Sequence, residues 1–279
     1  MSSYDYSTRK IKEKVFLLIV AFLTVTMFIP LFHIFLTVFI RGFPVLAENG
    51  TKFITGTFQD GGIGPAILGT LMLVVLASLL GLPVALLVGI YAYEYPRSSI
   101  GKITKALLQI MLEFPTILVG IFVMQILVVP MGSYSALAGA LSLAIIMMPY
   151  IAVYTTEALR QIPFTYREAA FGMGLTRIKV VFRILIPMAK RGILTGVLIG
   201  IAKVAGETAP LLFTAGGAYQ TYYQGITKPV GAIPLLIYQL IQSPSNEYHE
   251  IAWGASLVLL IIFLALFIPV RLSLKEVKL

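Results

Sequence analysis

Long apolar runs dominate this sequence, and several of them approach the roughly 20 residues that a helix needs to cross a membrane. Of the 279 residues, 58% are hydrophobic and only 12% are charged, a composition too apolar for a water-soluble domain. Continuous apolar runs of this length satisfy their backbone polar groups in lipid by forming α-helices. We therefore predict an all-α integral membrane protein.

The apolar runs predict six transmembrane helices in a single domain that covers residues 1–279. The predicted spans cover about residues 15–40, 64–93, 106–129, 136–154, 193–215 and 251–270. Between the last two spans, Pro234–Gln242 has the composition of a short surface or re-entrant helix. The sequence contains no proline-rich or serine-rich linker that would divide it into further domains.

Lysine and arginine gather between alternate spans, and this bias predicts the orientation of the chain. The segments assigned to the cytoplasm hold 17 of the 21 Lys and Arg residues, including the C-terminal cluster of Arg271, Lys275 and Lys278. Cytoplasmic segments of membrane proteins carry such an excess. We predict a multi-pass protein of the cell membrane with both termini in the cytoplasm. The net charge of +9 then has a topological meaning, and we expect no nucleic-acid partner.

The segment Tyr154–Gly196 is the most highly charged interruption between two apolar runs, and it carries seven basic residues. It is patterned as two short helices: helix formers run from Arg167 to Met173, Gly174 supplies a stop, and a second amphipathic run covers Thr176–Ile186. One interpretation is a positive loop that lies on anionic lipid headgroups. The other is a compact docking surface for a partner protein.

The order Glu, Ala, Ala and then Gly in this segment resembles the EAA loop of binding-protein-dependent ABC importer permeases. In that family, a short coupling helix docks into a groove of a cytoplasmic ATPase. The resemblance implies a coupling loop over about residues 158–191. It also implies that ATPase coupling involves Arg167, Glu168, Ala169, Ala170 and Gly174.

Two further stretches, GETAPLLFTAG and FPTILVGIF, narrow the resemblance to the A-type permease subunits of phosphate (Pst) ABC importers. The likeness covers roughly residues 69–216 and implies a type I ABC importer permease that moves inorganic phosphate into the cytoplasm. It also implies three kinds of partner: two ATP-binding cassette subunits, an extracytoplasmic anion-binding protein, and a homologous C-type permease or a second copy of this chain. The sequence has no GxxxxGK[ST] phosphate loop, so we expect ATP to be bound by a partner and no cofactor to be held here.

Chemistry within the bundle must come from few polar groups, because charge in hydrocarbon is costly and by default marks a functional site. Lys203 and Glu207 lie four residues apart in the predicted fifth span, so they share a helix face and can pair. They form either a structural ion pair or part of an anion path. In the second case, Lys203 attracts the anionic substrate, and Glu207 pairs with Lys203 when no substrate is bound. The path is predicted to include the adjacent Thr208.

The string Glu113-Phe114-Pro115-Thr116 lies in the predicted third span. A proline at a helix start leaves the following N–H groups free, so Thr116 can begin a half-helix whose N-terminus binds oxyanions. The alternative is an ordinary proline kink with Glu113 facing a loop. We include Glu113, Pro115 and Thr116 in the predicted substrate path.

The chain departs from the phosphate permease pattern in the predicted fourth span. Val153 and Thr156 occupy the positions where this family usually carries Arg and Glu, and only Glu157 remains there as a candidate for the path. Lys203 stands where the family often has Arg. Lysine keeps the positive charge but lacks the planar guanidinium group that binds an oxyanion through two nitrogens. Tungstate, molybdate or sulfate are therefore alternative substrates. An ion-coupled secondary transporter would have no use for the EAA loop, and the absence of cysteine leaves no thiolate metal site.

The charge bias makes the predicted topology testable with reporter fusions. Fusions at Lys52 and Gln224 should report the outside of the cell, and fusions at Ser99 and Thr176 should report the cytoplasm, because charged cytoplasmic segments resist translocation. The measurement is the ratio of alkaline phosphatase to green fluorescent protein activity at each site. Reversed signals at either pair of sites would contradict the six-span arrangement.

Overall fold

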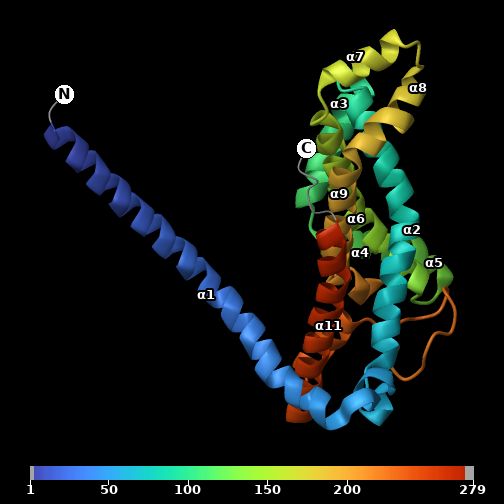
Figure 1. Cartoon of the computed structure of the whole chain (residues 1–279). Helices are drawn as coiled ribbons and strands as arrows, with labels where there is room; N and C mark the ends of the chain where they lie inside the picture. The colour runs from blue at the N-terminus through green and yellow to red at the C-terminus, as the bar shows by residue number, and fades with distance from the viewer. Residues whose placement is uncertain (1–2, 274–279) are drawn as a thin grey trace.

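The computed structural model describes residues 3–273, and helices account for most of that length (Figure 1). The predicted all-α fold is confirmed, because the described residues contain no β-strand and only one isolated bridge, between Gly216 and Val230. Lys275 and Lys278 of the predicted C-terminal cluster lie outside the described residues. The helices are α1 Ser3–Thr55, α2 Gly64–Glu94, α3 Ser99–Glu113, α4 Thr116–Val123, α5 Val129–Met131, α6 Ala136–Arg160, α7 Phe164–Gly172, α8 Arg177–Val180, α9 Ile186–Ala205, α10 Ile233–Ile241 and α11 Asn246–Ser273.

Five helical segments of the described chain are long and apolar enough to cross a membrane. Four belong to α1, α2, α6 and α11, and the fifth runs from Arg177 to Ala205 through α8, a π turn at Val181–Leu185, and α9. A bent pair of helices between α2 and α6 makes a sixth span if it is counted as one. The structure thus holds five or six candidate spans.

The bent pair covers residues 99–131 and includes residues 106–129, which the sequence predicts as one span. Here α3 ends at Glu113, and the helical segment Thr116–Met131 leaves it at an angle of 102°. The two intervening residues, Phe114 and Pro115, have ψ values of 132° and 118°, far from helical geometry. A proline disfavours the helical region for the residue before it, which explains the break.

Small residues let the central helices approach closely. Ala77, Gly81, Ala85 and Gly89 of α2 are buried at four-residue intervals and face α6. A Cβ atom at Gly89 would lie 2.6 Å from the Ala152 carbonyl oxygen of α6, so no larger residue fits there. Gly192, Gly196 and Gly200 of α9 pack in the same way on the other side of α6. This small-residue spacing is typical of helix contacts in membranes.

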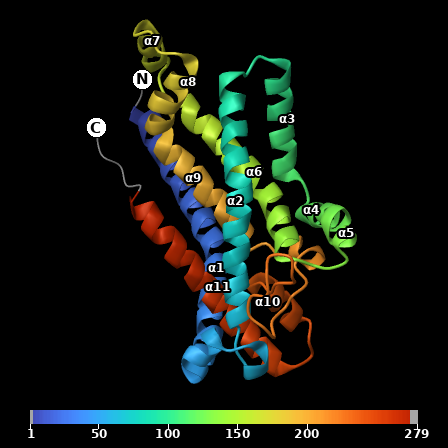
Figure 2. The ribbon, with the colours of Figure 1, turned by 90° about the vertical axis from the view of Figure 1, so that its right-hand side faces the viewer.

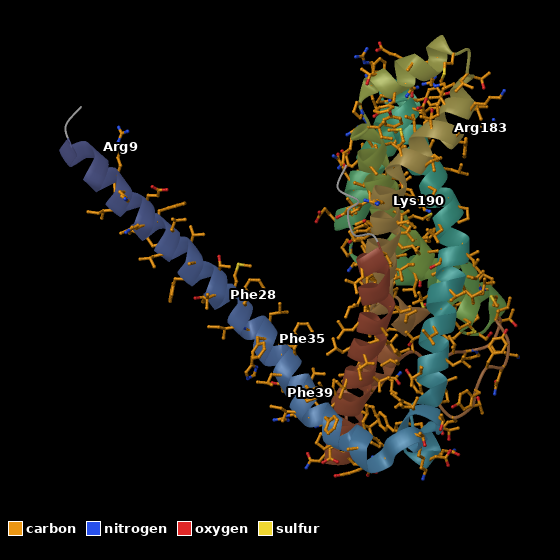
Figure 3. The ribbon with its side chains drawn as sticks, viewed as in Figure 1. Arg9, Phe28, Phe35, Phe39, Arg183 and Lys190 are labelled. Carbon is orange, nitrogen blue, oxygen red and sulfur yellow. The ribbon has the colours of Figure 1, made fainter. Side chains whose placement is uncertain are left out.

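The helix α1 forms a long arm that leaves the body of the protein (Figure 1). None of the residues in its most apolar stretch is buried, and Phe28, Phe35 and Phe39 are exposed along the arm (Figure 3). The arm joins the body near Gly42, where a Cβ atom would lie 2.7 Å from the Trp253 carbonyl oxygen of α11. Most of the surface of this apolar helix has no partner among residues 3–273.

The two ends of the molecule differ in construction (Figure 2). One end carries α7, the turn after it and α8, which together form a knob over residues 164–180. The other end carries α10 and the long segment 206–232 that precedes it. The two short helices predicted on either side of Gly174 are confirmed, and Gly174 has a φ of 78°. A φ in this left-handed region favours glycine and ends α7.

Candidate functional site

The Lys203–Glu207 pair predicted from the sequence is present at the end of α9. The Lys203 Nζ atom lies 2.6 Å from Glu207 Oε1. The glutamate side chain is only 11% exposed, whereas the lysine side chain is 39% exposed. The helix α9 ends at Ala205, ten residues before the predicted end of this span, because Gly206 and Pro210 interrupt it. The carboxylate therefore sits beside irregular backbone rather than within a helix.

The second carboxylate oxygen of Glu207 contacts the bent helix pair at Thr116. Thr116 Oγ1 donates a hydrogen bond of 3.3 Å to Glu207 Oε2. Thr116 is the first residue of α4, and Pro115 before it provides no side-chain cap. The N-terminus of a helix carries partial positive charge and favours an anion nearby. The structure thus joins Lys203, Glu207 and Thr116 in one polar cluster, with a carboxylate at the start of α4.

A groove opens beside this cluster between α3, α4 and α6. Its volume is about 320 Å³, and Phe114, Thr116 and Tyr150 are among the residues that line it. The remaining lining is apolar, so the hydroxyl groups of Thr116 and Tyr150 provide its side-chain polarity. The groove is therefore predominantly apolar, and Thr116 joins it to the polar cluster.

Three other predicted path residues, Glu113, Thr208 and Glu157, have no side-chain bond to the cluster among the described residues. Glu113, at the end of α3, is exposed and forms no ion pair within the described residues. The backbone oxygen of Thr208 accepts hydrogen bonds from Leu211 and Leu212, so this residue shapes the turn after Glu207. Glu157 is exposed and pairs with Arg160 at 2.7 Å near the knob end, roughly 15 Å along the bundle from the level of Lys203.

The two positions at which the chain departs from the phosphate permease pattern serve packing. Thr156 Oγ1 donates to the Gly89 carbonyl oxygen of α2 at 2.9 Å, and Val153 is half-buried on the same helix. The Thr156 bond joins α6 to α2 at Gly89, where a Cβ atom would lie 2.6 Å from the Ala152 carbonyl oxygen.

The sequence analysis missed the central residue of the knob end, Glu94. This glutamate ends α2, and its side chain is only 5% exposed. Arg167 of α7 holds both carboxylate oxygens at 2.7 Å through its two terminal nitrogens. Arg177 of α8 donates from Nε to Oε2 at 2.6 Å and from Nη2 to the Glu94 carbonyl oxygen at 2.7 Å. One buried carboxylate therefore binds both helices of the knob.

Aromatic rings cover the two arginines of this cluster. The Arg167 guanidinium lies 5.8 Å from the Tyr93 ring centroid and 5.6 Å from that of Phe171, and Arg177 lies 4.3 Å from that of Tyr95. Hydrogen bonding to Glu94 raises the pKa of Arg167 above its ordinary value, because the carboxylate stabilises the charged guanidinium. A signal was present in the sequence: an acidic residue at a helix C-terminus is unfavourable alone and implies a cationic partner.

The remaining predicted coupling residues take distinct positions on the knob. Ala170 is buried against α6, whereas Glu168 and Ala169 of the same helix are exposed. Several large apolar side chains of the knob are also exposed: Phe164, Tyr166, Phe171, Met173 and Ile178. An apolar surface on a charged segment marks a site for a partner.

Comparisons with known proteins agree on one group. The profile of the family described as "Binding-protein-dependent transport system inner membrane component" matches residues 81–275. The chain is 61% identical to the "Probable phosphate transport system permease protein PstA" of Methanocaldococcus jannaschii over 99% of each chain. It is 38% identical to the "Phosphate transport system permease protein PstA" of Pasteurella multocida, over 96% of this chain and 99% of the relative.

A solved structure shares the fold at low sequence identity. The structure described as "Inward facing conformations of the MetNI methionine ABC transporter" matches with a TM-score of 0.60 at 20% identity. The match covers 77% of this chain and 96% of the other. This likeness supports the helical arrangement and says nothing about the substrate.

The pairing of Lys203 with Glu207 predicts a coupled effect on stability. Lys203→Met should lower the free energy of unfolding by about 1–3 kcal/mol, because it leaves the Glu207 carboxylate without its cation and with Thr116 as its remaining side-chain partner among the described residues. Lys203→Met combined with Glu207→Met should recover part of that loss. The measurement is the unfolding transition in detergent, with Glu157→Gln at the exposed pair as a control that changes it by less than about 0.5 kcal/mol. A double variant no more stable than Lys203→Met would contradict this coupling.

Proposed function

Because the chain belongs to the family of binding-protein-dependent transport system inner membrane components, we propose that it carries inorganic phosphate across the membrane as the permease of an ATP-driven importer. The chain is a multi-pass, non-catalytic membrane subunit, and ATP is hydrolysed by a separate partner. Phosphate is favoured because relatives at 61% and 38% identity over nearly their full lengths are named phosphate permeases. Tungstate, molybdate and sulfate share its anionic chemistry and remain the alternative substrates.

The single observation that supports an anion path is the double engagement of Glu207. Its carboxylate binds Lys203 with one oxygen and Thr116, at the start of α4, with the other. Each partner is a donor that suits an oxyanion equally well. An incoming phosphate can exchange with the carboxylate for Lys203 and Thr116, after which Glu207 repels it onward. The carboxylate then returns and closes the path.

The knob is the proposed contact with the ATPase. Its exposed apolar side chains and the exposed Glu168 and Ala169 form a surface outside the apolar spans. The buried side of the knob, at Ala170, packs on α6. A docking helix needs both properties, one face for the partner and one for the body of the permease. This end of the molecule, together with both termini, is proposed to lie in the cytoplasm.

A second permease subunit is the proposed partner of the arm α1. The arm exposes its apolar residues on all sides away from the body (Figure 3). An apolar groove of about 540 Å³ also lies between α2, α9 and α11. Both surfaces fit a homologous permease, either a C-type subunit or a second copy of this chain. The opposite end, with α10 and the segment 206–232, is proposed to receive the binding protein.

Anion uptake by the reconstituted complex tests the substrate and the path together. The wild-type complex should take up radiolabelled phosphate in the presence of ATP, and excess tungstate should compete weakly. Lys203→Glu combined with Glu207→Lys keeps an ion pair but reverses the order of charge along α9. We expect this variant to assemble and to lose phosphate uptake by about tenfold or more, since the helix start at Thr116 would then face a cation.

Two results would contradict parts of this proposal. Preferential uptake of tungstate, molybdate or sulfate would reject phosphate as the substrate while leaving the importer class intact. Normal phosphate uptake by the charge-reversed variant would show that the Lys203–Glu207 pair is structural and that the path lies elsewhere.

The left-handed backbone at Gly174 gives a test of the knob. Gly174→Val should strain the turn by about 1–2 kcal/mol and misplace α7, because side chains rarely adopt a φ of 78°. Phosphate-stimulated ATP hydrolysis by the complex should fall while membrane insertion continues. Gly172→Val is the matched control, because that position also has open space around it but no positive φ, and its effect should be smaller. Equal, near-normal ATPase stimulation in both variants would assign the knob to the lipid surface.

A further inference from the structure

We propose that Glu94 is a positioning residue that makes the knob and α2 move as one unit, so that a displacement of the knob by the ATPase reaches the centre of the permease. This inference rests on the proposed function for its coupling role. The tie itself is a property of the chain alone and can be tested separately.

The geometry ties both knob helices to one side chain. Arg167 brings two parallel hydrogen bonds from α7, and Arg177 brings two more from α8, one of them to the Glu94 backbone oxygen. Paired bonds from a planar guanidinium fix orientation as well as distance. The turn at Gly174 lies between the two arginines, so both sides of the turn are held from the same point.

Burial makes this tie different from the other ion pairs at the knob end. The side chain of Glu94 is 5% exposed and that of Arg167 is 14% exposed, whereas Glu157 and Arg160 are 53% and 43% exposed. Exposed pairs contribute little because water screens them. A buried carboxylate that loses its partners is strongly unfavourable, which penalises any movement of the knob away from α2.

On the side of Glu94 away from the knob, α2 runs into the transmembrane core. The helix α2 continues from Glu94 through Gly89, where it contacts α6 closely and receives the hydrogen bond from Thr156. The same α6 helix carries Tyr150 beside the groove at Thr116. Apolar packing of Ala170 and Val180 also holds the knob, but such contacts permit sliding, whereas the Glu94 bonds are directional.

The first readout measures the tie in the assembled complex. The chain contains no cysteine, so Met173→Cys on the knob and Leu87→Cys on α2 can carry a pair of spin labels at exposed positions. In the otherwise unaltered protein, the distance between the labels should stay narrow and unchanged with and without ATP. Adding Glu94→Gln should broaden the distribution and make it depend on nucleotide.

The second readout is the amount of phosphate transported per ATP hydrolysed. Glu94→Gln should lower this ratio by about tenfold, within the range by which residues along a coupling path change coupling. The matched control is Lys102→Gln, which removes an exposed charge from the same region and should leave both readouts unchanged. If Glu94→Gln prevents assembly, Arg177→Gln provides both readouts, since it keeps the Glu94–Arg167 pair.

The outcomes separate this inference from the proposed function. A narrow label distance in Glu94→Gln, or a broad one with a normal ratio of phosphate to ATP, would overturn the positioning role. A wild-type complex that carries no phosphate would overturn the proposed function. In that case the label distances with and without ATP still decide whether Glu94 holds the knob to α2.

Discussion

The close contact of α2 with α6 is the constraint on which the rest of the structure depends. Burial of apolar surface gives little preference for helix contact over lipid, so helices associate through tight packing and backbone proximity. Gly89 lets the two backbones meet, and Thr156 adds a hydrogen bond across the contact. Because α6 also packs against α9, this helix fixes the position of Lys203 on one side and of Glu94, through α2, on the other.

Charge is distributed in the protein so that the buried carboxylates have partners. Glu94 and Glu207 are the two most buried members of the described ion pairs, and each lies at the end of a helix rather than within one. Both are C-terminal ends, where the free carbonyl groups carry partial negative charge, so each carboxylate depends on its cationic partner. The difference between the two sites is rigidity. Glu94 is bound by paired arginine bonds, and Glu207 is bound by one lysine and one hydroxyl group, which exchange more readily.

Local chemistry made several features predictable from the sequence, and long-range contacts made others unpredictable. The break at Pro115, the left-handed turn at Gly174 and the Lys203–Glu207 pair each depend on residues within a few positions of one another. The contact of Glu94 with Arg167 joins residues 73 positions apart, and no helical period relates them. The end of α9 at Ala205 was also missed, because apolar composition continues through residues that Gly206 and Pro210 exclude from the helix.

The junction of α1 with α11 has a consequence for biosynthesis. Gly42 packs against Trp253, so the first transmembrane helix meets its partner only after more than two hundred further residues have been translated. Until then, the nascent chain must keep α1 in the bilayer without this contact, while α2 and α6 can already pair during insertion. Closure of the subunit is therefore a late event, and a chain truncated before α11 would insert its earlier helices yet leave the first one unanchored.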